Sequence, residues 1–437
     1  MADQPAEETK PEVEADAKHC RPRYRSFLAA LAVSLIFYFA YDNIVPLQDA
    51  EKYFVDYRLR SGRMTAANNH LIYVSVDRVS YDQYFFGSVL TNATGDDRYY
   101  METLRGEFPW NREIFAGAVS KLAEMGASRI LLNFTFAVEK PEDPEIKKVL
   151  DRHADKVVIG ASFEVSPSMI AFIYPSPTLI ERNEFGEMPP DQRVGFVALH
   201  TDVDGIARRG LYDLSMNQLV KDNFGEHGMF FPEDLTYQSF SSRIMRSFNR
   251  GNELPPPSEH PLLRFTGPRG AFTTVSFKDL FDPAVRKANF ERTGFFKDKI
   301  VIIGPGKAVL PEQFRTPLRL GDATMDGSEL HLNYLNAALQ GELIKELSSP
   351  ANKSLVLASG AILLLLTFFV SSPVKRIIGG TFLAGLWLAI SAWQYDKNNL
   401  MLGAVITPMA LLVVGGMISA LFDRPSPAQP SDQPCQT

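Results

Sequence analysis

The sequence predicts an α/β domain with a mainly parallel sheet and an added antiparallel hairpin, flanked by one N-terminal and three C-terminal transmembrane helices. Two observations predict this arrangement. Long apolar runs occur only near the two ends of the 437-residue chain. Between them, short apolar runs alternate with stretches of helical periodicity, a pattern typical of parallel sheets that helices cover on both faces.

The apolar runs predict four membrane crossings. The first extends from Phe27 to Ile44 and contains one charged residue, Asp42, near its outer end. Each run is close to the roughly 20 residues that cross a hydrocarbon core of about 30 Å. We expect transmembrane helices at 26–46, 353–372, 377–394 and 400–422. The alternative for each run, a buried core helix, is disfavoured because the last three runs lie close together.

Basic residues beside the runs predict the topology, because short loops rich in Lys and Arg stay in the cytoplasm. Such residues precede the first run, separate the second from the third, and follow the fourth. They are Arg21, Arg23, Arg25, Lys375, Arg376 and Arg424. All three positions agree on cytoplasmic termini and place residues 47–352 outside. No convincing small-x-small cleavage site precedes Asp42, so we expect an uncleaved signal anchor rather than a removed signal peptide.

The outermost segments, residues 1–25 and 423–437, are expected to be disordered cytoplasmic tails. Residues 1–18 are acidic and contain few large apolar side chains. Both cysteines, Cys20 and Cys435, lie in these tails, so the exported domain is expected to fold without disulfides. The formal net charge of −6 argues against a nucleic-acid partner.

Within residues 47–352, apolar runs rich in β-branched residues predict buried strands, and periodic stretches between them predict helices. We expect strands at 70–78, 128–137, 156–165 and 299–305, and helices at 112–125 and 143–151. Gly126 is placed to end the first of these helices. The pair Asp204–Gly205 lies in the middle of an alternating stretch, 193–215, and predicts the added hairpin because Asp-Gly suits a tight turn.

Six segments resemble a known family in their sequence and in their order. They are VSVD (74–77), FPWNR (108–112), MGASRILLNF (125–134), VGFV…DVDGIARR (194–209), FKDKIVIIGPG (296–306) and TP…DGSELHLNYLNAALQGEL (316–343). Together with the apolar runs, they resemble the type-two CHASE family, the cyclase/histidine-kinase-associated sensory extracellular domains. The resemblance covers nearly all of residues 47–422. It implies an extracytoplasmic sensory module in a bacterial inner membrane.

Family members usually carry a cytoplasmic cyclase or kinase after the last helix. Only residues 423–437 follow here, so the resemblance implies a separate output protein. Asn133 stands where the family commonly has an Asp at the end of the second strand, and Glu312 stands where an Asp is expected before the Thr-Pro pair. Both departures weaken the expectation of a ligand site built on carboxylates.

Nine residues are candidates for ligand contact, because strand ends and helix starts converge on clefts in α/β domains. They are Asp77, Trp110, Arg112, Asn133, Asp204, Arg208, Gly304, Glu329 and His331. The arginines among them suit an anionic ligand. Structural alternatives stay open, with Asp77 capping a turn, Trp110 in the core and Arg112 in an ion pair.

Three short motifs resemble known sites but lack required residues. Gly304-Pro-Gly-Lys307 lacks the first glycine and the hydroxyl residue of a phosphate loop. Asp202-Val-Asp204-Gly205 lacks the Gly and the Glu that complete a calcium loop. Glu329, His331 and Asn333 would share one face of a strand, as a metal site requires, but the residues that follow favour a hydrogen-bonded helix start. We therefore expect no cofactor and no metal.

The leading hypothesis is a sensor without catalytic activity, in which an unknown ligand binds the outer domain and the helices signal to a separate cytoplasmic or membrane protein. The alternative is a scaffold for a cell-envelope complex. A third hypothesis, an extracytoplasmic hydrolase, is disfavoured because the known catalytic motifs are absent from the sequence. Besides the lipid bilayer, a second copy of this chain is an expected partner. The pairs Gly415/Ser419 and Gly416/Ala420 permit the close helix approach that a homodimer would use. Pro408 is expected to kink the last helix.

Overall fold

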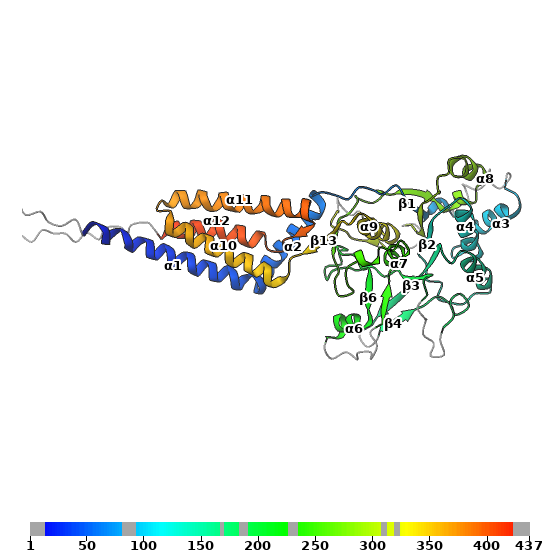
Figure 1. Cartoon of the computed structure of the whole chain (residues 1–437), viewed down its shortest axis with the longest axis horizontal. Coiled ribbons are helices and arrows are strands. Elements are labelled where there is room, and N and C mark those ends of the chain that lie inside the picture. Colours follow the sequence, from blue (N-terminus) through cyan, green and yellow to red (C-terminus); the bar gives the residue numbers. More distant parts are fainter. Residues whose placement is uncertain are drawn as a thin grey trace, which may run out of the picture. The chain divides into compact units, whose positions relative to one another are not determined.

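The computed structural model forms two compact units (Figure 1). It describes residues 14–80, 93–166, 170–182, 191–225, 235–306, 313–318 and 324–422. The membrane unit combines Met1–Gly62 with Lys345–Thr437, and the α/β unit is Arg63–Ile344. The exported domain expected at 47–352 includes the whole α/β unit and also parts of the membrane unit. Of the tails expected to be disordered, 1–25 and 423–437, residues 1–13 and 423–437 lie outside the described residues, whereas residues 14–25 belong to a helix, α1 (Glu14–Asn43).

The α/β unit is organised by one sheet in the order β4-β3-β2-β10-β1-β9, with β5 also paired to β3. Its strands are β1 (Leu71–Val76), β2 (Arg129–Leu132), β3 (Val157–Val165), β4 (Ile170–Ile173), β5 (Val194–Phe196), β9 (Thr273–Ser276) and β10 (Ile300–Pro305). All pairs are parallel except β3–β4. Because β1, β2, β9 and β10 are parallel neighbours, their carboxyl ends meet at one edge.

Side chains alternate between the two faces of the sheet, and both faces are buried. On β10, Val301 and Ile303 belong to one hydrophobic core, whereas Ile300 and Ile302 belong to the other. Helices α4 (Glu113–Glu124) and α5 (Asp143–Arg152) contribute to the first core. Helices α7 (Phe240–Ser247) and α9 (Gly327–Gln340) contribute to the second core. Burial on both faces explains why these strands are nearly continuous apolar runs rather than alternating ones.

Shorter elements complete the α/β unit. The helices are α3 (Gly95–Leu104), α6 (Met216–Phe224) and α8 (Pro283–Val285), with the 3-10 helices η1 (Arg78–Ser80), η4 (Gly251–Glu253) and η5 (Phe277–Leu280) and the π-helical η6 (Arg286–Glu291). The additional strands are β6 (Asp213–Ser215), β7 (Thr236–Gln238), β8 (Leu262–Leu263), β11 (Gln313–Phe314) and β12 (Met325–Asp326). Strand β13 (Leu343–Glu346) crosses the boundary between the two units, with Leu343 and Ile344 in the α/β unit and Lys345 and Glu346 in the membrane unit.

The mixed α/β class and the mainly parallel sheet are confirmed, and the expected strands correspond to β1, β2, β3 and β10. The expected helices correspond to α4 and α5. Gly126, with φ of 87°, follows α4 in the left-handed conformation that a glycine adopts readily.

The prediction of a hairpin at 193–215 is wrong. The Asp202 N–H donates to the Ile206 carbonyl and the Gly205 N–H to the Asp202 carbonyl, which closes a turn, and Gly205 has φ of 74°. Within residues 191–225, however, this turn joins no pair of strands. The flanking residues bridge instead to other segments, Ile206 to Arg315 and Arg209 to Leu262. Tertiary partners therefore satisfy the backbone that a hairpin would have paired. The antiparallel hairpin of the sheet is formed by β3 and β4.

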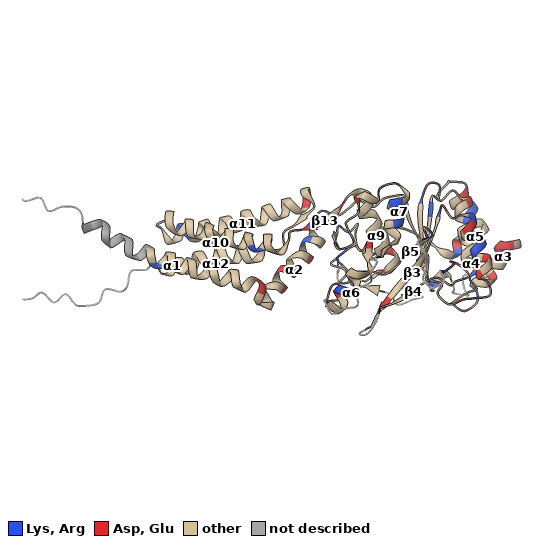
Figure 2. Cartoon of the chain, turned by 60° about the horizontal axis from the view of Figure 1, so that its bottom comes forward, with Lys and Arg blue, Asp and Glu red and all other residues tan. Residues whose placement is uncertain are grey.

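The membrane unit is a bundle of apolar helices. Figure 2 shows few charged residues along them. They are α1 (Glu14–Asn43), α10 (Ser349–Phe369), α11 (Pro373–Asn398) and α12 (Ile406–Leu421). Among the described residues, Tyr24–Asn43, Ser349–Phe369 and Pro373–Asn398 are long and apolar enough to cross a membrane. A further helix, α2 (Val45–Ser61), belongs to this unit, although the sequence analysis placed its residues in the exported domain.

The last apolar run differs from the expected span at 400–422. Residues Leu400–Met401 form strand β14, which pairs with Lys345 and Glu346 of β13, so α12 begins only at Ile406 and has 16 residues. At 1.5 Å per residue, such a helix is about 24 Å long, less than the ~30 Å of a hydrocarbon core. The expected kink at Pro408 is also wrong. Pro408 lies in the first turn of α12, where backbone N–H groups lack intrahelical partners anyway.

Glycines allow the bundle helices to approach one another closely. A Cβ on Gly380 of α11 would lie 2.5 Å from the backbone oxygen of Leu412 in α12. A Cβ on Gly415 of α12 would lie 2.3 Å from Leu363 Cδ2 in α10, and one on Gly360 would lie 3.0 Å from Ser34 Cβ in α1. The small residues therefore act within one chain, where close backbone approach replaces the hydrophobic driving force that lipid removes.

We predict that Gly380→Ala lowers the thermal unfolding midpoint of the full chain in detergent micelles, whereas Gly385→Ala does not. Both glycines lie in α11, but no heavy atom lies within 4 Å of a Cβ at Gly385. At Gly380 the obstacle is backbone, which yields less readily than a side chain, and overpacking typically costs about 1–3 kcal/mol. Equal midpoints for the two variants would show that α11 and α12 do not pack in this way.

Candidate functional site

The carboxyl edge of the sheet carries the first of the candidate residues, Asp77. It follows β1 directly, and its Oδ1 accepts hydrogen bonds from the Ser80 backbone N–H (3.0 Å) and hydroxyl (2.7 Å). The same oxygen accepts one from Ser276 Oγ at the end of β9 (2.9 Å). Asp77 therefore caps η1 and links two neighbouring strand ends. It retains a second carboxylate oxygen for which the described residues provide no hydrogen bond.

Asn133 and Gly304 meet at the same edge. Asn133 follows β2, and its amide donates to Ser328 Oγ at the start of α9 (2.9 Å). Gly304, on the neighbouring strand β10, faces both groups, since a Cβ there would lie 2.0 Å from Ser328 Oγ and 3.0 Å from Asn133 Cβ. Tyr73 of β1 donates its hydroxyl to the Pro305 carbonyl (2.8 Å). The edge thus gathers an amide, hydroxyls and a carboxylate from β1, β2, β9 and the start of α9, with β10 lying between β1 and β2.

Glu329, in the first turn of α9, is buried with 3% of its surface exposed. Its Oε1 accepts from the backbone N–H groups of Gly270 (2.6 Å) and Ala271 (3.1 Å). Burial raises the pKa of Glu329, while these two donors act in the opposite direction. Two residues on, His331 points elsewhere, with Nε2 3.1 Å from the Val197 carbonyl oxygen. The hydrogen-bonded helix start is confirmed, and Glu329 and His331 do not form one site.

Trp110 and Arg112 lie in the layer of α4 and α5. The Trp110 ring is 5% exposed and stacks on Phe277, with ring centroids 5.9 Å apart. Arg112 Nη1 lies 2.7 Å from Oδ1 of the fully buried Asp143, and its guanidinium covers the Phe136 ring at 5.2 Å. These are the structural alternatives that the sequence left open for both residues.

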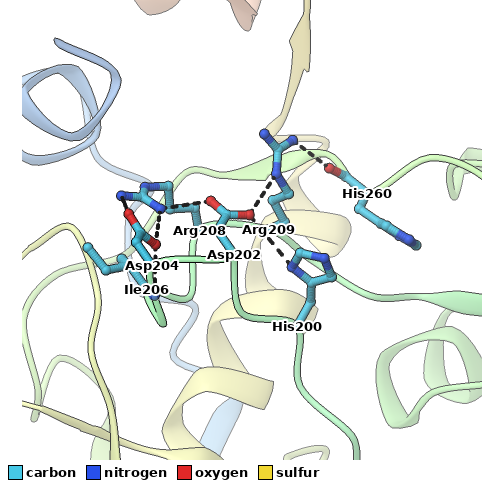
Figure 3. A network of polar contacts seen from close by, with 7 residues as sticks. All are labelled: His200, Asp202, Asp204, Ile206, Arg208, Arg209 and His260. Carbon is cyan, nitrogen blue, oxygen red and sulfur yellow. Dashed lines mark hydrogen bonds and ion pairs between the residues drawn. The ribbon is translucent and has the colours of Figure 1, made fainter. Parts of the chain in front are cut away.

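Asp204 and Arg208 belong to a separate polar network, which Figure 3 shows from close by. Arg208 donates to both oxygens of Asp204 (2.8 and 2.7 Å) and to Asp202 (2.8 Å). Asp202 also accepts from Arg209 (3.1 Å), so two carboxylates face two guanidinium groups. Arg208 lowers the pKa of Asp204 through these hydrogen bonds. Because the charges balance internally, this network suits fixing the 200–209 loop better than binding an anion.

Two histidines lie beside this network. The rings of His200 and His260 are 5.3 Å apart, and His200 Nδ1 lies 3.9 Å from Asp202 Oδ1. Burial lowers the pKa of both side chains, and in His260 the neighbouring His200 lowers it further. Among the described residues, no group of His, Cys, Asp and Glu side chains is arranged to hold a metal ion.

Sequence reasoning missed a buried carboxylate in the membrane unit. Glu51 of α2 is 8% exposed, and its Oε2 accepts from the N–H groups of Val405 and Ile406 (3.0 Å each). Its Oε1 accepts from the Thr407 N–H (2.8 Å) and hydroxyl (2.7 Å). One side chain therefore satisfies the orphan donors at the start of α12 and places a negative charge at its positive end. A single Glu in a short helix gives no sequence signal for a partner so far along the chain.

Asn352 and Arg376 make comparable connections. Asn352 of α10 donates to the Leu347 carbonyl (2.9 Å) and accepts from the N–H groups of Gly403 and Ala404 (3.0 and 3.2 Å). Arg376 of α11 is 1% exposed and donates to three carbonyls at helix ends. The acceptors are Val370 (2.7 Å), Ser371 (3.3 Å) and Ser419 (3.5 Å). Arg376, which the sequence analysis used only as a basic residue beside an apolar run, thus links α10, α11 and α12.

The structure brings together Asp77, Asn133 and Gly304 at the carboxyl edge, and Asp204 with Arg208 in the network. It leaves Trp110, Arg112 and His331 in packed positions elsewhere. Glu312 and Lys307 lie outside the described residues. Since ligands of open α/β sheets bind beyond the carboxyl ends of the strands, this edge is the candidate functional site.

Comparison with known protein families finds one match. The model of the CHASE2 domain matches residues 28–371, which is most of the chain. The comparisons with curated proteins and with solved structures find no match.

We predict that Gly304→Ala destabilises the α/β unit and that Ser328→Ala partly relieves this effect. Alone, the new methyl would collide with Ser328 Oγ, and Ser328→Ala alone would lose the hydrogen bond from Asn133. In the double variant the nearest remaining atom is Asn133 Cβ at 3.0 Å. A double-mutant cycle on the full chain, read from thermal unfolding, should give a favourable coupling of about 0.5–3 kcal/mol. Purely additive effects would contradict the contact.

We predict that His331 makes the protein less stable as the pH falls from about 6.5 to about 4. Burial lowers the pKa of His331 from 6.5 to about 4, so in this window the unfolded chain binds a proton that the folded chain excludes. The full effect corresponds to about 3 kcal/mol at 1.36 kcal/mol per pKa unit. The pH dependence of the unfolding midpoint should flatten in His331→Phe and persist in the control His70→Gln, whose side chain is exposed. An unchanged slope in His331→Phe would refute the assignment.

Proposed function

Because this chain belongs to the CHASE2 domain family, whose members are extracellular sensory domains, we propose that its α/β unit binds a ligand outside a bacterial inner membrane. The membrane unit then passes the resulting change to a separate output protein. In this proposal the chain acts as a sensor without catalysis of its own, its termini are cytoplasmic, and the α/β unit is periplasmic. The basic residues beside the apolar runs support this orientation.

The observation that carries the ligand-binding part is the polar carboxyl edge. Asp77, Asn133 and Ser328 bring hydrogen-bonding groups to the ends of β1 and β2, the two parallel strands beside β10, and to the start of α9. Gly304 has no side chain between them, and any side chain there would collide with Ser328. A few convergent polar groups beyond the strand ends are what a small-ligand site requires. The edge has more neutral donors and acceptors than charges, which favours a polar ligand of low charge.

The signalling part rests on how the bundle helices are tied. Glu51 holds the start of α12 to α2, and Arg376 holds the ends of α10 and α12 to the start of α11. Hydrogen-bonded contacts of this kind have discrete alternative arrangements. A buried charged group that lost only some of its hydrogen bonds would leave polar atoms unpaired, so its partners change together. A displacement of one helix is therefore expected to move its tied neighbours. The turn between α10 and α11 presents exposed Lys375 to a partner.

We predict that a small polar ligand raises the thermal unfolding midpoint of the full chain in lipid nanodiscs, as tested with a panel of sugars, amino acids and nucleosides. At about 100 times the dissociation constant, binding stabilises the folded state by about 2.7 kcal/mol, a shift of several degrees. Asn133→Ala should reduce this shift relative to its own ligand-free midpoint. The matched control, Asn69→Ala, lies at the opposite edge of the sheet and is exposed.

Two results would contradict the proposal. One is that no compound in the panel shifts the midpoint of the unaltered chain, which would leave the scaffold role as the better account. The other is that Asn133→Ala and Asn69→Ala respond alike to a compound that does bind, which would place the ligand away from the carboxyl edge.

A further inference from the structure

A second site lies at the opposite, amino-terminal edge of the sheet. A cavity of about 260 Å³ opens there, where β2 begins at Arg129 and where Lys156 precedes β3. Helix α7 contributes Arg243 and Arg246 to the same cavity. The cavity is smaller than the roughly 300–1,000 Å³ of drug-sized ligand sites, so its occupant must be small.

The lining of this cavity is strongly positive. Four cationic side chains line it, and one carboxylate, that of Asp155, lies among them. Arg246 has an ion pair with Asp213, but within the described residues Arg129, Lys156 and Arg243 have none. The amino-terminal edge therefore carries three cations that have no salt bridge among the described residues, although Asp191 and Asp213 act on Arg243 at longer range.

The two uncompensated arginines are held in place by neutral acceptors. Arg129 donates Nε to Ser247 Oγ (3.0 Å) and Nη1 to the Ser128 carbonyl (2.7 Å), and its guanidinium covers the Phe248 ring at 5.1 Å. Arg243 donates Nε to the Val194 carbonyl (2.6 Å). Burial lowers the pKa of Arg243, because removing a cation from water is costly, while the carboxylates of Asp191 and Asp213 act in the opposite direction. Positioned guanidinium groups with free N–H donors match the geometry of an oxyanion.

A neutral acceptor completes the lining. Gln238 lines the same cavity, and its Oε1 is buried without a hydrogen-bond partner among the described residues. A buried acceptor left without a donor costs about 1–3 kcal/mol. An O–H group on a ligand would satisfy it. A fully deprotonated anion such as sulfate has no donor to offer this oxygen.

We propose that the cavity binds a small oxyanion that also carries a hydroxyl group, the chemistry shared by hydrogenphosphate and small hydroxycarboxylates. The guanidinium groups of Arg129 and Arg243 and the ammonium of Lys156 pair with the anionic oxygens. Gln238 Oε1 accepts from the ligand hydroxyl. This site is independent of the carboxyl edge, because β2 and β3 run parallel and their first residues lie at the other edge of the sheet.

The test is isothermal titration of the full chain in detergent micelles with inorganic phosphate, malate, sulfate and succinate, in a buffer free of oxyanions. Phosphate or malate should bind, and sulfate and succinate should bind more weakly. Tighter binding of phosphate would identify the ligand as hydrogenphosphate, and tighter binding of malate would identify it as a hydroxycarboxylate. Arg243→Gln should weaken binding about tenfold or more, as expected for a lost charge-assisted hydrogen bond.

Lys156→Gln is the second variant, because within the described residues the Lys156 side chain has no hydrogen bond or ion pair whose loss would unfold the protein. It should also weaken binding. Arg292→Gln, an equal change of charge at an exposed position outside the cavity, should leave binding unchanged, as should Asn133→Ala. The proposal is overturned if none of the four anions binds, if sulfate binds as tightly as phosphate, or if Arg292→Gln weakens binding as much as Lys156→Gln.

Discussion

The membrane unit depends on one carboxylate that holds the start of a helix. Helix α12 begins within an apolar bundle, where water is not available to satisfy the free N–H groups of its first turn. Glu51 supplies both carboxylate oxygens to Val405, Ile406 and Thr407, so α2 and α12 are joined by four hydrogen bonds to one side chain. Because the loss of this group would leave several buried donors unpaired, α12 cannot shift against α2 without an alternative partner. The tie from Arg376 imposes the same condition at the other ends of α10 and α12.

The α/β unit obeys a different constraint. Because both faces of the sheet are buried, polar side chains gather at the two ends of the strands. The carboxyl edge and the amino-terminal edge of the sheet differ in charge. At the carboxyl edge, Asn133, Ser328 and Asp77 provide a mostly neutral set of hydrogen-bonding groups. At the amino-terminal edge, Arg129 and Arg243 provide a positive one. The two proposed ligands would therefore differ in chemistry, one at each edge, with the packed sheet between them.

The sequence predicted what depends on neighbouring residues. Strands β1, β2, β3 and β10 were identifiable because buried parallel strands are continuous apolar runs, and α4 was identifiable from its periodicity. The hairpin prediction failed because Ile206 and Arg209 pair with residues far along the chain, at Arg315 and Leu262. Glu51, Arg376 and the cavity at Arg129 were missed for the same reason, since each depends on partners that no local pattern indicates. Of the predicted site residues, the strand-end group Asp77, Asn133 and Gly304 came together because parallel strands share a carboxyl edge.

The central claim is that the chain passes a signal across the membrane to a separate protein. Site-specific photocrosslinking in the native membrane tests it most directly, with the photoreactive residue at exposed Lys375 and, as a control, at exposed Val203 of the α/β unit. The account predicts that the Lys375 position crosslinks to one cyclase, kinase or other cytoplasmic regulator, identified by mass spectrometry, and that the Val203 position does not. Crosslinks from Lys375 only to lipid, to copies of this chain or to envelope proteins would contradict it.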